Sequence, residues 1–237
     1  MTTDIPAQIA SLDWTGIAGR LEEDSHAVAG SLLSHPECAA LAEIYPVEET
    51  FRSRVVMARH GFGRGEYKYF AYPLPEIVAG LRAALYPPLA RISNAWNERL
   101  GVDSRYPDAH AHYLDRCHQA GQTKPTPLLL QYGEDDYNRL HQDLYGEHVF
   151  PLQAAILLSA PGTDFTGGEF ILTEQRPRMQ SRAEVVPLGQ GDCVIFPVRQ
   201  RPMQGVRGDY RVNMRHGVSR VRSGRRHTLG LIFHDAQ

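Results

Sequence analysis

The stretch LLLQYGEDDYNRLHQDLYGE, residues 128–147, begins with a short apolar run. It then carries a histidine two residues before an aspartate. In a β-strand, residues i and i+2 point to the same side, so His141 and Asp143 can hold one metal ion while Gln142 faces away. His216, on a distant strand, would add a second imidazole. Two histidines and one carboxylate occupy one face of an octahedral ferrous ion and leave three positions open. The spacing therefore predicts a ferrous site made of His141, Asp143 and His216.

An arginine pair follows the distal histidine by ten residues and opens the last apolar run of the chain. A guanidinium can bind the far carboxylate of a dicarboxylate co-substrate through two parallel hydrogen bonds. Because side chains alternate along a strand, only one of Arg225 and Arg226 can point inward. Arg226 shares its face of the expected strand with Thr228, so these two side chains are expected to lie together.

From Pro127 onward the chain consists of short apolar runs separated by turn signals. Eight such runs cover residues 128–132, 139–145, 152–159, 169–174, 184–188, 192–196, 211–221 and 227–233. This pattern predicts an α+β fold with a double-stranded β-helix, or jelly-roll, core over residues 127–237.

The first half of the chain, residues 1–126, carries helical patterns instead. Helices are expected over 6–45, over 75–100 with a kink or break at Pro87-Pro88, and over 107–119. Residues 51–60 are expected to form a strand, and residues 60–75 a hairpin or loop-to-strand unit that faces the substrate. We expect the N-terminal helices to pack on the jelly roll, so that residues 1–237 form one domain.

Length and composition narrow the class of protein further. No apolar run approaches the roughly 18 residues that span a membrane, and the first residues lack the basic and apolar regions of a secretory signal. The three cysteines, Cys38, Cys117 and Cys193, are odd in number and far apart, which indicates neither a disulfide framework nor a zinc site. A cytoplasmic protein is expected, with no membrane association and no obligate protein partner evident.

The net charge of −2 hides a strong asymmetry. Residues 1–50 contain nine acidic side chains and one basic one, whereas residues 171–226 contain twelve arginines and four acidic side chains. An arginine-rich stretch is often only a solvated face, but it is also typical of a surface that binds a polyanion. Arg199, Arg201 and Arg207 are therefore candidate phosphate contacts.

Several motifs together resemble the iron(II)- and 2-oxoglutarate-dependent dioxygenase superfamily. They are Tyr132, the His-Gln-Asp triplet, GGEF at 167–170, GDCVIF at 191–196 and HGVSRVRSGRRHTLGLIFHD at 216–235. The prolyl-hydroxylase branch also places its co-substrate arginine ten residues after the distal histidine. The resemblance thus implies Fe(II), 2-oxoglutarate and O₂ as cofactors, and Arg226 rather than Arg225 as the arginine that binds 2-oxoglutarate.

The segment around the triplet also resembles the AlkB-type nucleic-acid demethylases, which carry a tyrosine nine residues before Leu-His-Gln-Asp. By this resemblance Tyr132 is a candidate donor to 2-oxoglutarate. With FGRGEYKYFAYPLP at 62–75, the chain is similar to a bacterial family of small oxygenases thought to act on alkylated DNA. It departs from the AlkB pattern at Tyr145, where those enzymes carry an aspartate used at the substrate base, and in its shorter interval from His216 to Arg226. Tyr145 is a candidate substrate contact at this position.

The reaction that the resemblance implies is oxidative decarboxylation of 2-oxoglutarate to succinate and CO₂, coupled to hydroxylation of a C–H bond. An N-methyl group hydroxylated in this way leaves as formaldehyde. A DNA substrate needs a surface on which an extruded base can stack. Aromatic and basic residues alternate in one segment and are candidates for it, with packing of the hairpin as the alternative: Phe62, Arg64, Tyr67, Lys68, Tyr69 and Tyr72.

Three functions remain open at this level. The first is a dioxygenase that repairs alkylated nucleic acid, and the second is a hydroxylase of a protein or small molecule. The third is a DNA-binding protein that keeps the metal fold but turns over poorly. Salt-sensitive DNA binding separates the first and third from the second. Stimulation of 2-oxoglutarate turnover by alkylated DNA separates the first from the third.

Overall fold

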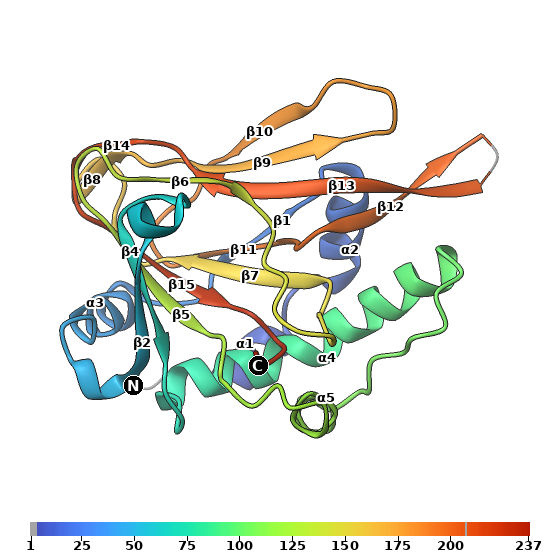
Figure 1. Ribbon diagram of the computed structural model, residues 1–237, viewed down its shortest axis with the longest axis horizontal. Helices are drawn as coiled ribbons and strands as arrows, with labels where there is room; N and C mark the ends of the chain where they lie inside the picture. Colours follow the sequence, from blue (N-terminus) through green and yellow to red (C-terminus); the bar gives the residue numbers. More distant parts are fainter. Residues whose placement is uncertain (1–3, 207) are drawn as a thin grey trace.

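The computed structural model describes residues 4–206 and 208–237. Two antiparallel sheets lie one above the other, and the long helix α4 lies below the lower sheet (Figure 1). The helices are α1 (Ile5–Ala10), α2 (Trp14–Glu23), α3 (His35–Glu43), α4 (Glu76–Arg99) and α5 (His110–Gln119). Among the described residues, no helix is both long enough and apolar enough to cross a membrane.

The lower sheet has seven strands, with β15 at its centre. In spatial order they are β1 (Ala27–Ser31), β11 (Asp192–Pro197), β7 (Leu152–Leu157), β15 (Arg226–Leu231), β5 (Leu128–Tyr132), β4 (Glu66–Phe70) and β2 (Phe51–Val56). Pairing of β15 with β5 sets Arg226 opposite Tyr132. The register thus brings together two residues that are 94 positions apart in the sequence.

The upper sheet carries the two histidines of the predicted metal site. Its order is β10 (Arg182–Val186), β9 (Phe170–Gln175), β13 (Gly208–Val218), β6 (Tyr137–His141) and β3 (Gly63–Arg64), and β12 (Gln200–Gly205) also pairs with β13. A separate pair joins β8 (Phe165–Gly167) to β14 (Val221–Gly224). Pairing of β13 with β6 places His216 directly opposite His141.

One large apolar cluster holds the helices against the seven-stranded sheet. Ile17 of α2 and Leu85 of α4 belong to the same buried cluster as Leu129, Ile195 and Leu229 of the sheet. These five side chains are at most 1% exposed. Burial of a Leu or Ile side chain contributes roughly 1.5–3 kcal/mol, so the cluster is a main source of stability.

The eight predicted strand runs all contain strands, but the N-terminal half differs from expectation in two places. Residues 27–31, expected to be helical, form the edge strand β1, in which Ala27 pairs with Ile195 and Gly30 adopts a left-handed φ of 79°. The open edge of β11 supplies this segment with backbone partners. The helix expected to break at Pro87-Pro88 is continuous, since α4 runs through both prolines with its buried face packed on the sheet.

A buried ion pair within the upper sheet binds Ser25, in the segment after α2. Arg201 of β12 is fully buried, and its Nη2 donates to Glu174 Oε2 of β9 at 2.5 Å. Ser25 lies between them, because its hydroxyl accepts from Arg201 Nε at 2.7 Å and donates to Glu174 at 2.9 Å. Burial opposes the charge on Glu174, but hydrogen bonds from Arg176, Ser25 and Arg201 lower its pKa to about 2.

We expect Arg201→Met to lower the free energy of unfolding by about 3 kcal/mol, because it leaves the buried Glu174 carboxylate short of a partner. Glu174→Gln in the same background should recover part of this loss by removing the charge. Arg199→Met, an exposed arginine two residues away, is the matched control and should change stability by less than about 0.5 kcal/mol. Urea unfolding followed by circular dichroism measures all three, and equal effects at 199 and 201 would contradict the prediction.

Candidate metal and co-substrate site

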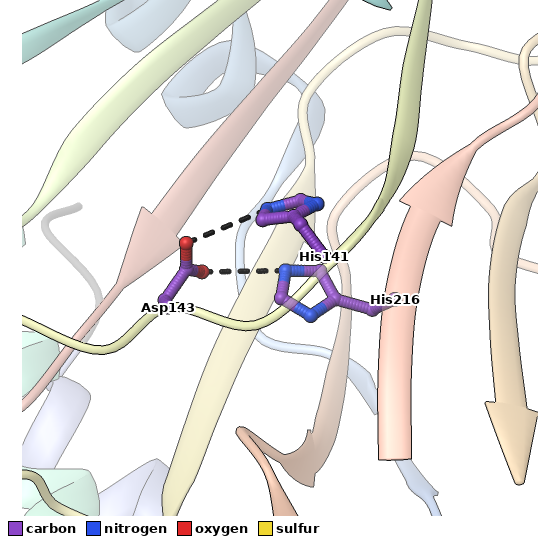
Figure 2. A group of neighbouring side chains, drawn as sticks. All are labelled: His141, Asp143 and His216. Carbon is purple, nitrogen blue, oxygen red and sulfur yellow. Dashed lines mark ion pairs between the residues drawn. The ribbon is translucent and has the colours of Figure 1, made fainter. Parts of the chain in front are cut away.

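His141, Asp143 and His216 point toward one another from two different parts of the chain (Figure 2). His141 Nε2 lies 3.4 Å from Asp143 Oδ1, and His216 Nε2 lies 3.3 Å from Asp143 Oδ2. The three candidate ligand atoms all lie within 4.8 Å of one another. Each residue thus offers one donor atom to a common point.

This arrangement fits a ferrous ion. Metal–ligand bonds of about 2.1 Å place neighbouring ligands of an octahedron roughly 3 Å apart, close to the two distances measured here. His141 Nδ1 lies 2.8 Å from the carbonyl oxygen of Arg139. A carbonyl can only accept, so Nδ1 carries the hydrogen and Nε2 keeps a lone pair for the metal. Two imidazoles and one carboxylate leave the remaining octahedral positions for other ligands.

The pKa values of Asp143 and His216 favour metal binding. Burial opposes the charge on Asp143, but hydrogen bonds with His141 and His216 hold its pKa well below the ordinary value, so the carboxylate is ionised. Burial, together with the nearby charge of His141, lowers the pKa of His216 and favours its neutral imidazole. Burial also disfavours a charged His141, although the hydrogen bond to Asp143 raises its pKa overall. An ionised carboxylate and a neutral imidazole are the forms that bind metal.

The strand argument for the His-Gln-Asp triplet was correct only in part. Strand β6 ends at His141, and Asp143 lies in the irregular segment that follows. Gln142 turns away as expected, and its amide donates to the carbonyl oxygen of Met214 at 2.8 Å. The position of Asp143 therefore depends on side-chain contacts rather than on a sheet ladder.

A cavity of about 230 Å³ contains the triad and extends to Arg226; we call it the triad cavity. Its wall also includes Phe62, Tyr67, Tyr132, Asn138, Leu144, Tyr145, Gln153 and Thr228. Phe62 and Leu144 remain 46% and 42% exposed, so they form the rim, whereas Tyr132 and Arg226 are buried. The cavity thus has an open apolar rim and a closed end that carries Tyr132 and Arg226.

Arg226 points into this interior and Arg225 points to solvent, so the predicted orientation is confirmed. Arg226 Nη1 donates to Thr228 Oγ1 at 2.6 Å, and the guanidinium lies 5.6 Å from the centre of the Tyr132 ring. Burial lowers the pKa of Arg226 to about 10, which still leaves a cation at neutral pH. Its Nε has no hydrogen-bond partner among residues 4–206 and 208–237. A buried cation with a free N–H fits the far carboxylate of 2-oxoglutarate.

The hairpin residues predicted to touch substrate divide into two groups. Lys68 is buried and its Nζ donates to Glu48 at 2.6 Å and to the carbonyl of Tyr45, so the prediction that it contacts substrate is wrong. Tyr69 packs inside an apolar cluster, so the prediction that its ring offers an open stacking surface for a base is also wrong. Tyr67 is 9% exposed but reaches the cavity wall. These residues alternate along β4, which has one face toward the cavity and the other toward Glu48.

The predicted phosphate contacts also need correction. Arg201 is wrong, because the Glu174 pair encloses it completely. Arg207 lies outside the described residues. Arg199 is exposed and lines a second cavity, and Arg64 is exposed with its Nε 3.9 Å from Asp136. Arg199 and Arg64 therefore remain available to a ligand.

Comparison with known proteins identifies the family. Residues 65–236 match the model of an oxygenase family described as catalysing oxidative methylation of damaged DNA. The chain belongs to this family. The matched range contains every triad residue as well as Tyr132, Arg226 and Thr228. The oxygenase is also 52% identical over 167 residues to two uncharacterised proteins of Mycobacterium tuberculosis, covering 70% of its own chain and 72% of theirs.

Solved structures share the fold at low sequence identity. A prolyl-4-hydroxylase from Pseudomonas putida superposes with a TM-score of 0.54 and 14% identity, covering 94% of the oxygenase and 99% of that chain. A prolyl hydroxylase from Trichoplax adhaerens gives a TM-score of 0.57 with 12% identity, covering 98% and 92%. A 2OG-Fe(II) oxygenase family oxidoreductase from Burkholderia pseudomallei gives 0.54 with 15% identity, covering 95% and 93%. The jelly-roll core is therefore the one found in these proteins.

The family and the triad together establish the type of enzyme. The oxygenase is 2-oxoglutarate-dependent and uses Fe(II), 2-oxoglutarate and O₂. His141, Asp143 and His216 provide a donor set suited to the iron. At the other end of the same cavity, Arg226 supplies a positive charge suited to a dicarboxylate.

Proposed function

We propose that this oxygenase removes alkyl groups from damaged nucleic acid, with DNA as its substrate. The observation that carries the proposal is the family match over residues 65–236, which includes the triad and Leu144 of the cavity rim. The buried position of Arg226 supports the co-substrate half of the reaction. Recognition of the nucleic acid would depend on the rim of the triad cavity and on the surface beside it.

The hydroxylation that the cofactors supply is suited to the removal of a methyl group from a base nitrogen. Bound Fe(II), 2-oxoglutarate and O₂ together supply hydroxylation of a C–H bond. Hydroxylation of an N-methyl carbon gives a hemiaminal, which breaks its C–N bond, releases formaldehyde and returns the hydrogen to the base nitrogen. Arg226 and Thr228 would hold the co-substrate at the closed end, which directs the reaction toward the open rim.

Phe62 is suited to hold a base at this rim. Its ring is 46% exposed and stacks on His60, with ring centres 5.3 Å apart and planes inclined by 23°. Its backbone is fixed, since its N–H donates to the Met57 carbonyl at 3.1 Å and its carbonyl accepts from Arg139 N–H at 2.8 Å. An aromatic ring held in this way can stack on any base. We therefore propose that Phe62 contacts the target base or its neighbour.

A second cavity of about 650 Å³, which we call the arginine cavity, lies across Leu144 from the triad cavity. Arg199 and Arg211 line it, and both are exposed. Glu147 is the acidic residue in its lining. Guanidinium groups bind phosphate well, and a strand whose target base enters the triad cavity would place a neighbouring phosphate nearby. We propose the arginine cavity as the backbone-binding part of the substrate site.

The direct test is formaldehyde release from methylated oligonucleotides. With Fe(II) and 2-oxoglutarate, the wild-type enzyme should release formaldehyde from a single-stranded methylated oligonucleotide and produce equal amounts of succinate. Arg199→Gln combined with Arg211→Gln should weaken binding and lower the slope of log affinity against log salt by about 0.7 per lost contact. Arg182→Gln, an exposed arginine on β10 that does not line either cavity, is the matched control and should bind like the wild type.

Two results would contradict the proposal in different ways. Turnover of 2-oxoglutarate without salt-sensitive binding to single- or double-stranded DNA would favour a hydroxylase of a protein or small molecule. Salt-sensitive binding without formaldehyde from any methylated oligonucleotide would favour a DNA-binding protein with weak turnover. Both assays use the same preparation of enzyme, so the outcomes can be compared directly.

A further inference from the structure

Two side chains hold the carboxylate of Asp143 from opposite sides. The hydroxyl of Tyr145 donates to Asp143 Oδ1 at 2.9 Å. The amide nitrogen of Gln153 donates to Asp143 Oδ2 at 3.0 Å and lies 3.2 Å from His216 Nε2. Each oxygen of the carboxylate therefore has its own neutral donor in addition to a histidine.

The direction of both hydrogen bonds follows from chemistry. An ionised carboxylate can only accept, so the group of Gln153 that faces it must be the NH₂ and not the carbonyl. The same rule makes the Tyr145 hydroxyl the donor. Gln153 is 5% exposed and lies on the otherwise apolar strand β7, where an unpaired amide nitrogen would be costly. A polar residue at this buried position is explained by its contact with Asp143.

We propose that Tyr145 and Gln153 are positioning residues that fix the orientation of Asp143 as a metal ligand. Asp143 lies beyond the last residue of β6, so no strand pairing fixes its backbone. A carboxylate on such a segment can rotate about its Cβ–Cγ bond. Donors to both oxygens hold one rotation, in which an oxygen faces the same point as the two histidines. The proposal is independent of the identity of the substrate.

The two positioning residues are themselves well supported. The ring of Tyr145 packs edge-on against Tyr69 with centres 6.2 Å apart, and its carbonyl accepts from Gln122 Nε2 at 3.1 Å. Gln122 is fully buried and also binds the carbonyl of Asp235 at 2.6 Å. Gln153 pairs with Phe196 in the middle of the seven-stranded sheet. Rigid supports on both sides make these donors effective in holding Asp143.

Tyr145→Phe and Gln153→Met test the proposal, because each removes one donor and changes the volume little. Mn²⁺ titrated into the metal-free full-length protein, followed by isothermal calorimetry, gives the dissociation constant without any turnover. We expect each variant to bind Mn²⁺ about 10- to 100-fold more weakly than the wild type, the usual effect of removing a hydrogen-bond partner from a metal ligand. The visible absorption of the Co²⁺-loaded protein should also change, because it reports the ligand geometry.

Tyr113→Phe is the control, since Tyr113 is a buried tyrosine in the helical core and does not line the triad cavity. It should bind Mn²⁺ like the wild type. Thermal unfolding shows whether each variant is folded. Dissociation constants within threefold of the wild type for both Tyr145→Phe and Gln153→Met would overturn the proposal. Loss of Mn²⁺ binding in Gln153→Met as complete as in Asp143→Ala would also overturn it, because Gln153 would then be a ligand.

Discussion

His141→Ala, Asp143→Ala and His216→Ala should each lower 2-oxoglutarate turnover by more than about 1,000-fold. Each substitution removes one of the three donor atoms that lie within 4.8 Å of one another. A bound metal ion contributes several kcal/mol to catalysis, and each 1.4 kcal/mol corresponds to about tenfold in rate. Succinate formation at saturating Fe(II) and 2-oxoglutarate measures the effect for each variant.

His112→Ala provides the control for this series, because His112 is exposed on α5 and does not belong to the triad. It should retain wild-type turnover. The triad variants should keep the far-ultraviolet circular dichroism spectrum of the wild type, since the large apolar cluster does not include these three residues. A variant that still forms succinate at the wild-type rate would remove its residue from the metal site.

Arg226→Ala should raise the KM for 2-oxoglutarate by about 100- to 1,000-fold. The guanidinium is 2% exposed and carries a charge, and loss of one partner of a buried charged pair costs roughly 3–5 kcal/mol. Arg226→Lys should give a smaller increase, because lysine keeps the charge but loses the two-pronged hydrogen bond. Steady-state kinetics with varied 2-oxoglutarate measures both.

Arg225→Ala is the matched control, since Arg225 is the adjacent arginine and its side chain is exposed. Its KM for 2-oxoglutarate should stay within about twofold of the wild type, as expected for an exposed substitution. If Arg225→Ala raised the KM more than Arg226→Ala, the register of β15 would be wrong by one residue. Such a shift would turn every side chain of the strand to the other face.

Local periodicity explains what could be predicted from the sequence. Alternation of side chains along a strand is a property of the backbone, so the inward orientation of Arg226 beside Thr228 follows from the chain alone. The spacing of His141 and Asp143 and the apolar runs after Pro127 are similarly local. They were sufficient to predict the strand-rich core and the three candidate metal ligands.

Pairing between distant residues could not be predicted in this way. Arg201 and Lys68 have the same formal charge as exposed basic residues, yet each is buried against a carboxylate, Glu174 and Glu48 respectively. A charged side chain is stable inside a protein only where such a partner exists, and nothing near it in the sequence identifies that partner. The predicted phosphate and base contacts at these two positions were wrong for this reason.

The hydrogen bonds that orient the Asp143 carboxylate were also decided by the tertiary structure alone. The sequence places Asp143 on a strand, but the ladder stops at His141, and the carboxylate is held by Tyr145 and by Gln153 from a different sheet. Side-chain periodicity determines which face a residue occupies. Only the packing of two sheets against each other determines which donors meet across that face, because their positions depend on contacts between residues far apart in the chain.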